Sequence, residues 1–164
     1  MSYRAVAITC SNRAADDRSE DRAGPVLREA LSELGLEVGQ AVVVPQDRDL
    51  LQRAIEAAIA DGARIVFTVG GASIGPTDVS TSLTKEMVSY EIPGLMEEIR
   101  RVGSTKEPRA LLSRGIAGVI DLPSAPPTLI VNSPGSRGGV RDTVSVVGPL
   151  LTYIVEQLDG AGHV

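Results

Sequence analysis

Histidine and cysteine are almost absent from this 164-residue chain, with one of each. A single cysteine, Cys10, excludes an internal disulfide and a cysteine-based zinc cluster. His163 is the penultimate residue, which argues against a Ser-His-Asp hydrolase and against a histidine-ligated metal site. Because Cys10 ends an apolar run, we expect a buried thiol there rather than a nucleophile.

Aromatic and basic side chains are also scarce. Aromatics make up 2% of the chain and tryptophan is absent, so the stacking platforms of most single-strand nucleic-acid binders are missing. The formal net charge is -5, and lysine occurs only at Lys85 and Lys106. An acidic chain without a basic stripe repels a phosphodiester backbone. We therefore expect no nucleic-acid partner.

Long apolar runs are missing as well. No segment approaches the roughly 20 apolar residues of a membrane span, and the N-terminus lacks a signal-peptide pattern. Hydrophobic residues still make up 43% of the chain, enough for one core. The sequence predicts a single domain over residues 1–164, in the cytoplasm and without a membrane partner.

Short β-branched runs alternate with helical patterns along the chain. This alternation predicts a mostly parallel sheet that helices cover on both faces, an α/β fold. Asp49 is expected to cap the second helix. Residues 11–22 are interpreted as a polar connection, and residues 110–119 as a segment holding a turn. The predicted strands span residues 5–10, 41–44, 65–69 and 129–131, and the predicted helices residues 25–34, 49–60, 81–90, 94–102 and 142–158.

The segments that follow the strands are richer in Gly, Ser, Asp and Arg than the segments that precede them. They span residues 11–13, 45–49, 70–78 and 132–139. Because the carboxyl ends of parallel strands lie at one edge of a sheet, these four segments should meet there. This asymmetry predicts a ligand site at that edge.

Two of these segments are glycine-rich loops that lead into helices, where backbone N–H groups attract phosphate. Arg137 lies nearby, and Asp78 and Asp47 would repel phosphate unless a divalent cation such as Mg²⁺ intervenes. The pattern favours a metal-assisted reaction of a nucleotide or phosphate. Pro76 stands where a P-loop requires lysine, and Ala72 breaks the dinucleotide glycine pattern.

Five stretches, in order, resemble the Mog/MoaB-type molybdopterin-binding domain of molybdenum-cofactor biosynthesis. They are Asp21-Arg22-x-Gly24-Pro25, Gly70-Gly71-x-x-x-x-Pro76-Thr77-Asp78, Ile92-Pro93-Gly94-Leu95, Leu112-Ser113-Arg114-Gly115-Ile116-Ala117-Gly118 and Leu129-Ile130-Val131-Asn132-Ser133-Pro134-Gly135-Ser136. The resemblance covers nearly the whole chain. It implies a three-layer α/β/α fold, commonly a homotrimer, and possible contact with the molybdate-inserting enzyme.

The same resemblance implies molybdopterin adenylyltransferase activity, in which ATP and molybdopterin react with Mg²⁺ to give adenylylated molybdopterin and pyrophosphate. Asp78 and Asp47 are the predicted catalytic and metal-binding residues. The predicted ligand-binding residues are Ser11, Asp21, Gly70, Gly71, Ser73, Ser113, Arg114, Ser133, Pro134, Gly135 and Ser136.

The chain departs from the family pattern at several site positions. Gln46 stands where the family has its second acidic residue, with Asp47 one residue later. Ala72-Ser73 replaces Thr-Gly, Thr77 replaces Arg, and Thr81-Ser82-Leu83 replaces Pro-Glu-Ala. These changes keep open a non-catalytic pterin-binding or carrier protein on the same fold. For Asp78 the alternative to a ligand role is a cap on the helix that begins near residue 79.

Overall fold

The computed structural model describes residues 2–161, so the sequence-based argument about His163 lies outside the described residues. Within that range seven strands form one sheet, in the order β2-β1-β4-β7-β6-β5, with β3 also paired to β1. The predicted mostly parallel sheet is confirmed, because only β6 runs antiparallel to its neighbours β5 and β7. The strands are β1 (Arg4–Cys10), β2 (Glu37–Val38), β3 (Val42–Val44), β4 (Ile65–Val69), β5 (Tyr90–Glu91), β6 (Ala117–Ile120) and β7 (Thr128–Ser133).

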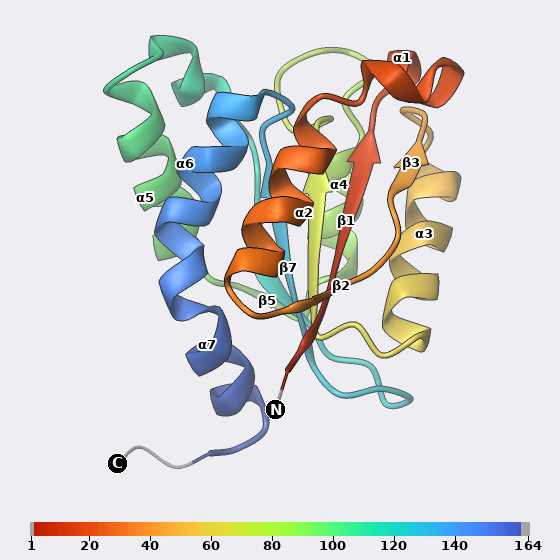
Figure 1. Ribbon diagram of the computed structural model, residues 1–164, viewed down its shortest axis with the longest axis vertical. Coiled ribbons are helices and arrows are strands. Elements are labelled where there is room, and N and C mark those ends of the chain that lie inside the picture. The colour runs from red at the N-terminus through yellow and green to blue at the C-terminus, as the bar shows by residue number, and fades with distance from the viewer. Residues whose placement is uncertain (1, 162–164) are drawn as a thin grey trace.

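Helices cover both faces of the sheet, which completes the predicted three-layer fold (Figure 1). Helices α2, α5, α6 and α7 pack on one face, and α3 and α4 on the other. In the described residues no helix is both long enough and apolar enough to span a bilayer. The α-helices are α1 (Asn12–Asp16), α2 (Ala23–Glu33), α3 (Arg48–Ala60), α4 (Ser80–Met87), α5 (Pro93–Ser104), α6 (Arg137–Val147) and α7 (Leu151–Leu158), and the 3₁₀ turns are η1 (Arg18–Glu20), η2 (Pro108–Leu112) and η3 (Gly148–Leu150).

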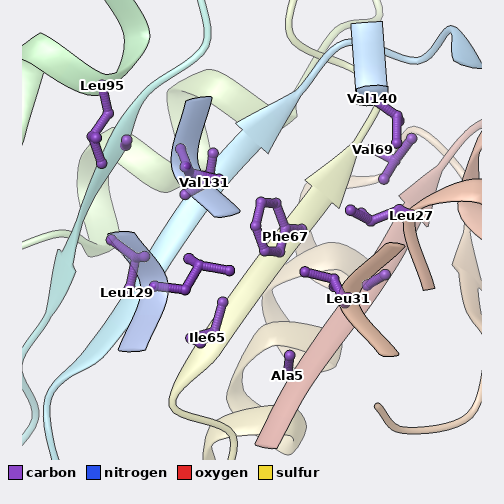
Figure 2. Packing of buried hydrophobic residues seen from close by; sticks show 14 of the residues in the cluster. Ala5, Leu27, Leu31, Ile65, Phe67, Val69, Leu95, Leu129, Val131 and Val140 are labelled. Atoms are coloured by element: carbon purple, nitrogen blue, oxygen red, sulfur yellow. The ribbon is translucent and has the colours of Figure 1, made fainter. Parts of the chain in front are cut away.

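Alternate residues of the central strands build two separate cores. In β4, Ile65 and Phe67 point into the core under α2, α5, α6 and α7, while Val66 joins the core under α3 and α4. Figure 2 shows Phe67 between Val131 and Leu31, on the first of these faces. Because β4 is buried on both faces, its sequence is continuously apolar rather than alternating.

A buried polar network joins the central strands to each other and to α4. The Asn132 side chain donates to the hydroxyls of Thr68 and Thr84, at 2.8 and 2.9 Å, and accepts from the Ile116 amide at 3.0 Å. Asn132 is completely buried, so an apolar side chain in its place would leave three polar groups without this hydrogen-bond partner. The network fixes α4 and the start of β6 to the end of β7.

The chain reverses its direction of travel across the sheet between β1 and β4. After β1 it passes through α2 to β2 and β3 on one side of β1, and after β4 it forms β5, β6 and β7 on the other side of β4. Cys10 pairs with Val44, Thr9 with Val69, and Val69 with Ser133, so four strand ends lie at one edge, as predicted. Such a switch point is where open α/β sheets hold their ligands.

Four local predictions are corrected by the structure. The polar connection after β1 contains α1, whose first turn is capped by Ser11. Asp47, not Asp49, caps α3. The segment 110–119, predicted to hold a turn, also contains the start of β6, a four-residue strand with a glycine at its second position. The predicted helix 142–158 is two helices, because Pro149 cannot donate the next helical hydrogen bond, and α6 begins five residues earlier than predicted.

Leu27→Ala should lower the free energy of unfolding by about 2–5 kcal/mol, because Leu27 is completely buried and the cavity cannot be filled without moving the sheet. Leu111→Ala is the matched control, since Leu111 is 64% exposed and should change stability by no more than about 0.5 kcal/mol. Urea denaturation followed by far-UV circular dichroism measures both. Equal losses for the two variants would contradict this core assignment.

Candidate functional site

The ends of β1, β4 and β7 approach each other so closely that only glycine fits between them. Gly70 follows β4 with φ +90°, and a Cβ there would lie 2.7 Å from the carbonyl oxygen of Cys10. Its amide donates to the Ser133 carbonyl at 3.0 Å. A Cβ on Gly135 would in turn lie 3.3 Å from the Gly70 Cα. Gly70 is therefore required by its backbone conformation and by the Cys10 carbonyl, and Gly135 packs tightly against it.

Gly71 makes a second tight contact, between the glycine loop and the start of α4. It has φ +70°, and a Cβ there would lie 2.5 Å from the Ser80 hydroxyl and 2.8 Å from the Gln46 side chain. Ser80 binds back to the loop: its amide donates to the Gly71 carbonyl and its hydroxyl to the Gly70 carbonyl. These two hydrogen bonds hold Gly70 and Gly71 against the start of α4.

Gln46 connects three of the segments that follow strands. Its Nε2 donates to the Cys10 carbonyl at 3.1 Å, and its Oε1 accepts from the Val79 amide at 3.4 Å. Its own amide donates to the Asn12 side chain at 2.8 Å. A carboxylate could accept from Val79 but could not donate to Cys10, so an acidic side chain could not replace this contact.

Asp78 holds the glycine loop in a compact turn. One carboxylate oxygen, Oδ2, accepts from the amides of Ser73 and Gly75 at 3.0 and 3.2 Å. The other oxygen, Oδ1, makes no hydrogen bond within residues 2–161, and the side chain is half-buried. The alternative reading, a cap on the following helix, is wrong, because α4 begins after Val79 without a side-chain cap.

Asp47 lies outside the clefts of this edge. It is exposed, and its carboxylate accepts from the Leu50 amide at 2.9 Å as the cap of α3. Gln46, one residue earlier, is the side chain that reaches the glycine loop. The predicted metal and catalytic role of Asp47 stays a prediction, with helix capping as its observed contact.

A cleft of about 510 Å³, here called cleft A, opens at the switch point between β1 and β4. Two predicted residues shape its wall. Ser11 caps α1 through the Ala14 amide, and Asp21 accepts from the Thr9 hydroxyl and the Gly24 amide. The residues that line the cleft also include Arg13, Arg22, Gln46, Gly70, Gly71, Gly135, Ser136 and Arg137.

A second cleft of about 230 Å³, cleft B, lies on the other side of the same glycines. It also contains Gly70, Gly71 and Gly135, so the two clefts meet at this junction. Asp78 and Ser73 line cleft B from the glycine loop. Ser113, Arg109 and Pro134 line it from the opposite side.

Arg114 fixes the wall of cleft B. Its guanidinium Nε donates to the Ser73 carbonyl at 2.7 Å, and its amide donates to the Ala72 carbonyl at 2.7 Å. The neighbouring Ser113 hydroxyl accepts from the Gly115 amide at 3.2 Å. Arg114 was predicted to contact ligand, and the contact that the structure gives it is to the loop that holds Asp78.

The serines after β7 have different surroundings. Ser136 is exposed, lines cleft A and caps α6 through the Gly139 amide at 3.0 Å. Ser133 is completely buried, and its hydroxyl contacts the Pro134 carbonyl and the Thr143 hydroxyl. Ser133 lines neither cleft A nor cleft B, so its predicted ligand contact stays a prediction.

Cys10 is buried beneath this junction, as expected. Burial raises the pKa of its thiol from 9.0 to about 11, although a hydrogen bond with Ser80 opposes the change. The thiol is therefore neutral near pH 7, and a neutral thiol is a poor nucleophile. Cys10 contributes packing and a carbonyl acceptor to the site.

No group of three or more Asp, Glu, His or Cys side chains suited to a metal ion occurs among residues 2–161. Mg²⁺ commonly takes only one or two carboxylates and completes its coordination with substrate phosphates and water. Asp78, with a free Oδ1 at the wall of cleft B, fits that requirement as a single carboxylate. The residues present thus fit Mg²⁺ only together with a phosphorylated ligand.

The sequence did not reveal the contribution of Arg109 or the contacts of Gln46. Arg109 lines cleft B from η2, a 3₁₀ turn that no sequence pattern predicted. Gln46 was noted as a departure, but its contacts with three segments depend on where those segments meet in space. The signal that could have drawn attention to Arg109 is its position just before the Ser113-Arg114 pair.

The sequence matches the family described as "Probable molybdopterin binding domain" over residues 6–153. It is 30% identical, over 97% of this chain, to the molybdenum cofactor biosynthesis bifunctional protein of Synechococcus elongatus, of which it covers 48%. The chain thus spans about half the length of that relative. It is 29% identical to the molybdopterin adenylyltransferase of Helicobacter pylori, over 93% of this chain and 86% of that protein.

Solved structures agree with the sequence match. A molybdopterin biosynthesis protein from Mycobacterium abscessus superposes with a TM-score of 0.87 at 35% identity, covering 96% of this chain and 97% of that one. The chain therefore belongs to the molybdopterin-binding domain family of molybdenum-cofactor biosynthesis.

Proposed function

We propose that this protein is a molybdopterin adenylyltransferase, which transfers AMP from ATP to the terminal phosphate of molybdopterin. The observation that carries the proposal is the junction of clefts A and B at Gly70, Gly71 and Gly135. Two phosphorylated ligands, one in each cleft, would bring their phosphates together there. Membership in a molybdopterin-binding family supports the pterin as one of the two.

In the proposed layout the nucleotide occupies cleft A and the pterin phosphate reaches the junction from cleft B. Arg13, Arg22 and Arg137 line cleft A and would offset the charge of a triphosphate. Helix α6 begins beside Gly135, and its N-terminus directs a partial positive charge at the same place.

The reaction is a displacement at phosphorus. An oxygen of the pterin phosphate forms a bond to the α-phosphorus of ATP, and the bond from that phosphorus to the departing pyrophosphate breaks. A phosphate monoester is already ionised near neutral pH, so no side chain has to remove a proton from the nucleophile. Catalysis then depends on positioning the two phosphates and on neutralising their charge. The glycine loop, which Asp78, Gln46 and Ser80 hold in place, would contribute to the positioning.

Asp78 is the residue proposed to hold Mg²⁺, through its free Oδ1. When bound, the ion would neutralise phosphate charge as the transition state forms. Oδ2 meanwhile keeps the Ser73 and Gly75 amides in place, so the same side chain orients the loop. Asp47 would bind Mg²⁺ only if its carboxylate gave up the hydrogen bond from the Leu50 amide that caps α3.

A second function, a pterin carrier without catalysis, is favoured by one observation. Gln46, a neutral side chain, lines cleft A where the resemblance expects a carboxylate, and its amide is held by two structural hydrogen bonds. A carrier would bind molybdopterin in the same clefts and release it unchanged.

Asp78→Asn should lower the rate of AMP transfer to molybdopterin by about 100-fold or more, because the amide is a poor ligand for Mg²⁺. Its side-chain oxygen can still accept from Ser73 and Gly75, so pterin binding should change little. Transfer is measured with ATP labelled at the α-phosphate, and pterin binding by fluorescence titration.

Asp121→Asn is the control for this experiment. Asp121 is exposed and follows β6, which runs antiparallel to β7, so it lies at the sheet edge opposite the site. Adenylyl transfer by the wild type, retained in Asp121→Asn and lost in Asp78→Asn, would support the proposed enzyme. Molybdopterin binding by the wild type without any transfer would overturn it in favour of the carrier.

Gln46→Glu should destabilise the fold by about 1–3 kcal/mol at neutral pH, because a carboxylate would face the Cys10 carbonyl without a hydrogen to donate. Gln40→Glu is the matched control, since Gln40 is exposed and its side chain makes no hydrogen bond among residues 2–161. Thermal unfolding at constant pH compares the two. An unchanged midpoint for Gln46→Glu would show that the Cys10 contact contributes nothing.

A further inference from the structure

Two helices end at an aspartate that stands directly before a glycine. Asp61 is the C-cap of α3 and precedes Gly62, and no other residue pair in the sequence is Asp-Gly or Asn-Gly except one. That second pair is Asp159, the C-cap of α7, with Gly160. In both turns the glycine has a positive φ, +93° and +79°, and its amide donates to the carbonyl three residues earlier at 3.0 Å. The next amide donates to the carbonyl five residues earlier, which completes a common glycine-closed helix end.

This kind of helix end does not need an aspartate. Helix α2 ends in the same two hydrogen bonds, with Leu34 before Gly35. A carboxylate at the C-terminus of a helix also faces the negative end of the helix dipole, which disfavours it. A compensating contact is therefore expected at Asp61 and at Asp159, and in both turns the structure supplies an arginine.

Arg64, which directly precedes β4, holds both carboxylate oxygens of Asp159. Its Nη1 and Nη2 donate to them at 3.2 and 2.6 Å, and its Nε donates to the Pro127 carbonyl at 3.2 Å. The Arg64 side chain is 14% exposed. Its planar guanidinium matches the geometry of a carboxylate. The contact ties the end of α7 to the sheet edge where β1 and β4 begin (Figure 1).

The turn at Asp61 is held by more than its arginine. Arg4 Nη2 lies 2.5 Å from the Asp61 Oδ2. The chain then enters β4 through Ala63, which is 2% exposed, so the sheet holds this turn as well as the helix. Ala161, at the equivalent place after α7, is exposed. The position of Asp159 therefore depends more on its arginine than the position of Asp61 does.

An aspartate before a glycine can rearrange without an enzyme. The glycine nitrogen attacks Cγ of the protonated side chain, a C–N bond forms, the nitrogen loses its proton, and the side-chain hydroxyl leaves as water. Water then opens the resulting succinimide ring at either carbonyl. One opening restores aspartate, and the other gives isoaspartate, in which the main chain runs through Cγ. Glycine favours the attack because it has no side chain to shield its nitrogen.

We infer that Asp159-Gly160 is a site of isoaspartate formation and that Arg64 suppresses this reaction in the folded protein. Arg64 holds the carboxylate, and the Gly160 amide hydrogen is engaged with the Gln157 carbonyl, so neither reacting group is free. Hydrogen bonds from Arg64 also lower the pKa of Asp159, which reduces the amount of the protonated acid that the reaction requires. Isoaspartate would carry its carboxylate on Cα, away from Arg64, and would loosen the end of α7.

The test replaces Arg64 by methionine, which keeps an apolar stem without the guanidinium. During incubation at neutral pH and fixed temperature, Arg64→Met should form isoaspartate at residue 159 about 3- to 10-fold faster than the wild type, a range between an exposed ion pair and a hydrogen bond to a charged group. Peptide mapping by mass spectrometry locates the product, and labelling with isoaspartyl methyltransferase measures its amount. Asp61 in the same molecules is the internal reference and should not change.

Three further variants make the result specific. Arg101→Met removes an exposed arginine that pairs with Glu98 inside α5, and it should stay at the wild-type level. Asp159→Glu combined with Arg64→Met should abolish the gain, because a glutamate would have to close a larger ring. Arg64→Lys keeps a charge without the two-pronged contact and should give an intermediate rate, so it carries the test if Arg64→Met does not fold.

Equal rates at residue 159 in the wild type and in both Arg64 variants would overturn the inference. A parallel rise at residues 61 and 159 in the Arg64 variants would also overturn it, because general unfolding rather than loss of a local contact would then be the cause. Thermal unfolding of each variant measures that cause independently. No readout uses a ligand, so this inference and the proposed function can fail separately.

Discussion

The contact on which the site depends is between backbone and backbone, where Gly70 lies against the Cys10 carbonyl and the Gly135 Cα. Parallel pairing of β1, β4 and β7 brings these three strand ends to one edge, and the register sets them side by side. Only residues without a side chain allow the loops to close at that point. Clefts A and B lie on either side of the closure and share its atoms.

Polar side chains then keep the junction in one conformation. Gln46 joins the end of β1 to the start of α4, Asp78 folds its own loop, and Arg114 ties that loop to the segment after η2. Each contact ends on a backbone group, so the loops are positioned by the scaffold rather than by a ligand. In the proposed reaction, such a site would hold two phosphates close together with little reorganisation, which is what transfer between them needs.

Much of this arrangement could be predicted from the sequence, because it depends on local rules. Continuous apolar runs predicted the central strands. Gly70-Gly71 and Asp78 predicted a ligand loop at the sheet edge where the structure has the glycine loop. Asp47 could not be placed, since helix capping and metal binding use the same carboxylate chemistry and the choice depends on where Gln46 points.

The most direct measurement of the account is pyrophosphate release from ATP by purified protein and Mg²⁺, with and without freshly prepared molybdopterin. If clefts A and B bring two phosphorylated ligands to one junction, release should occur with the pterin present and fall to background without it. Release that is independent of the pterin would contradict the account, because it would make the junction a nucleotide site alone. Absence of release despite bound pterin would contradict the transfer reaction and leave a binding protein.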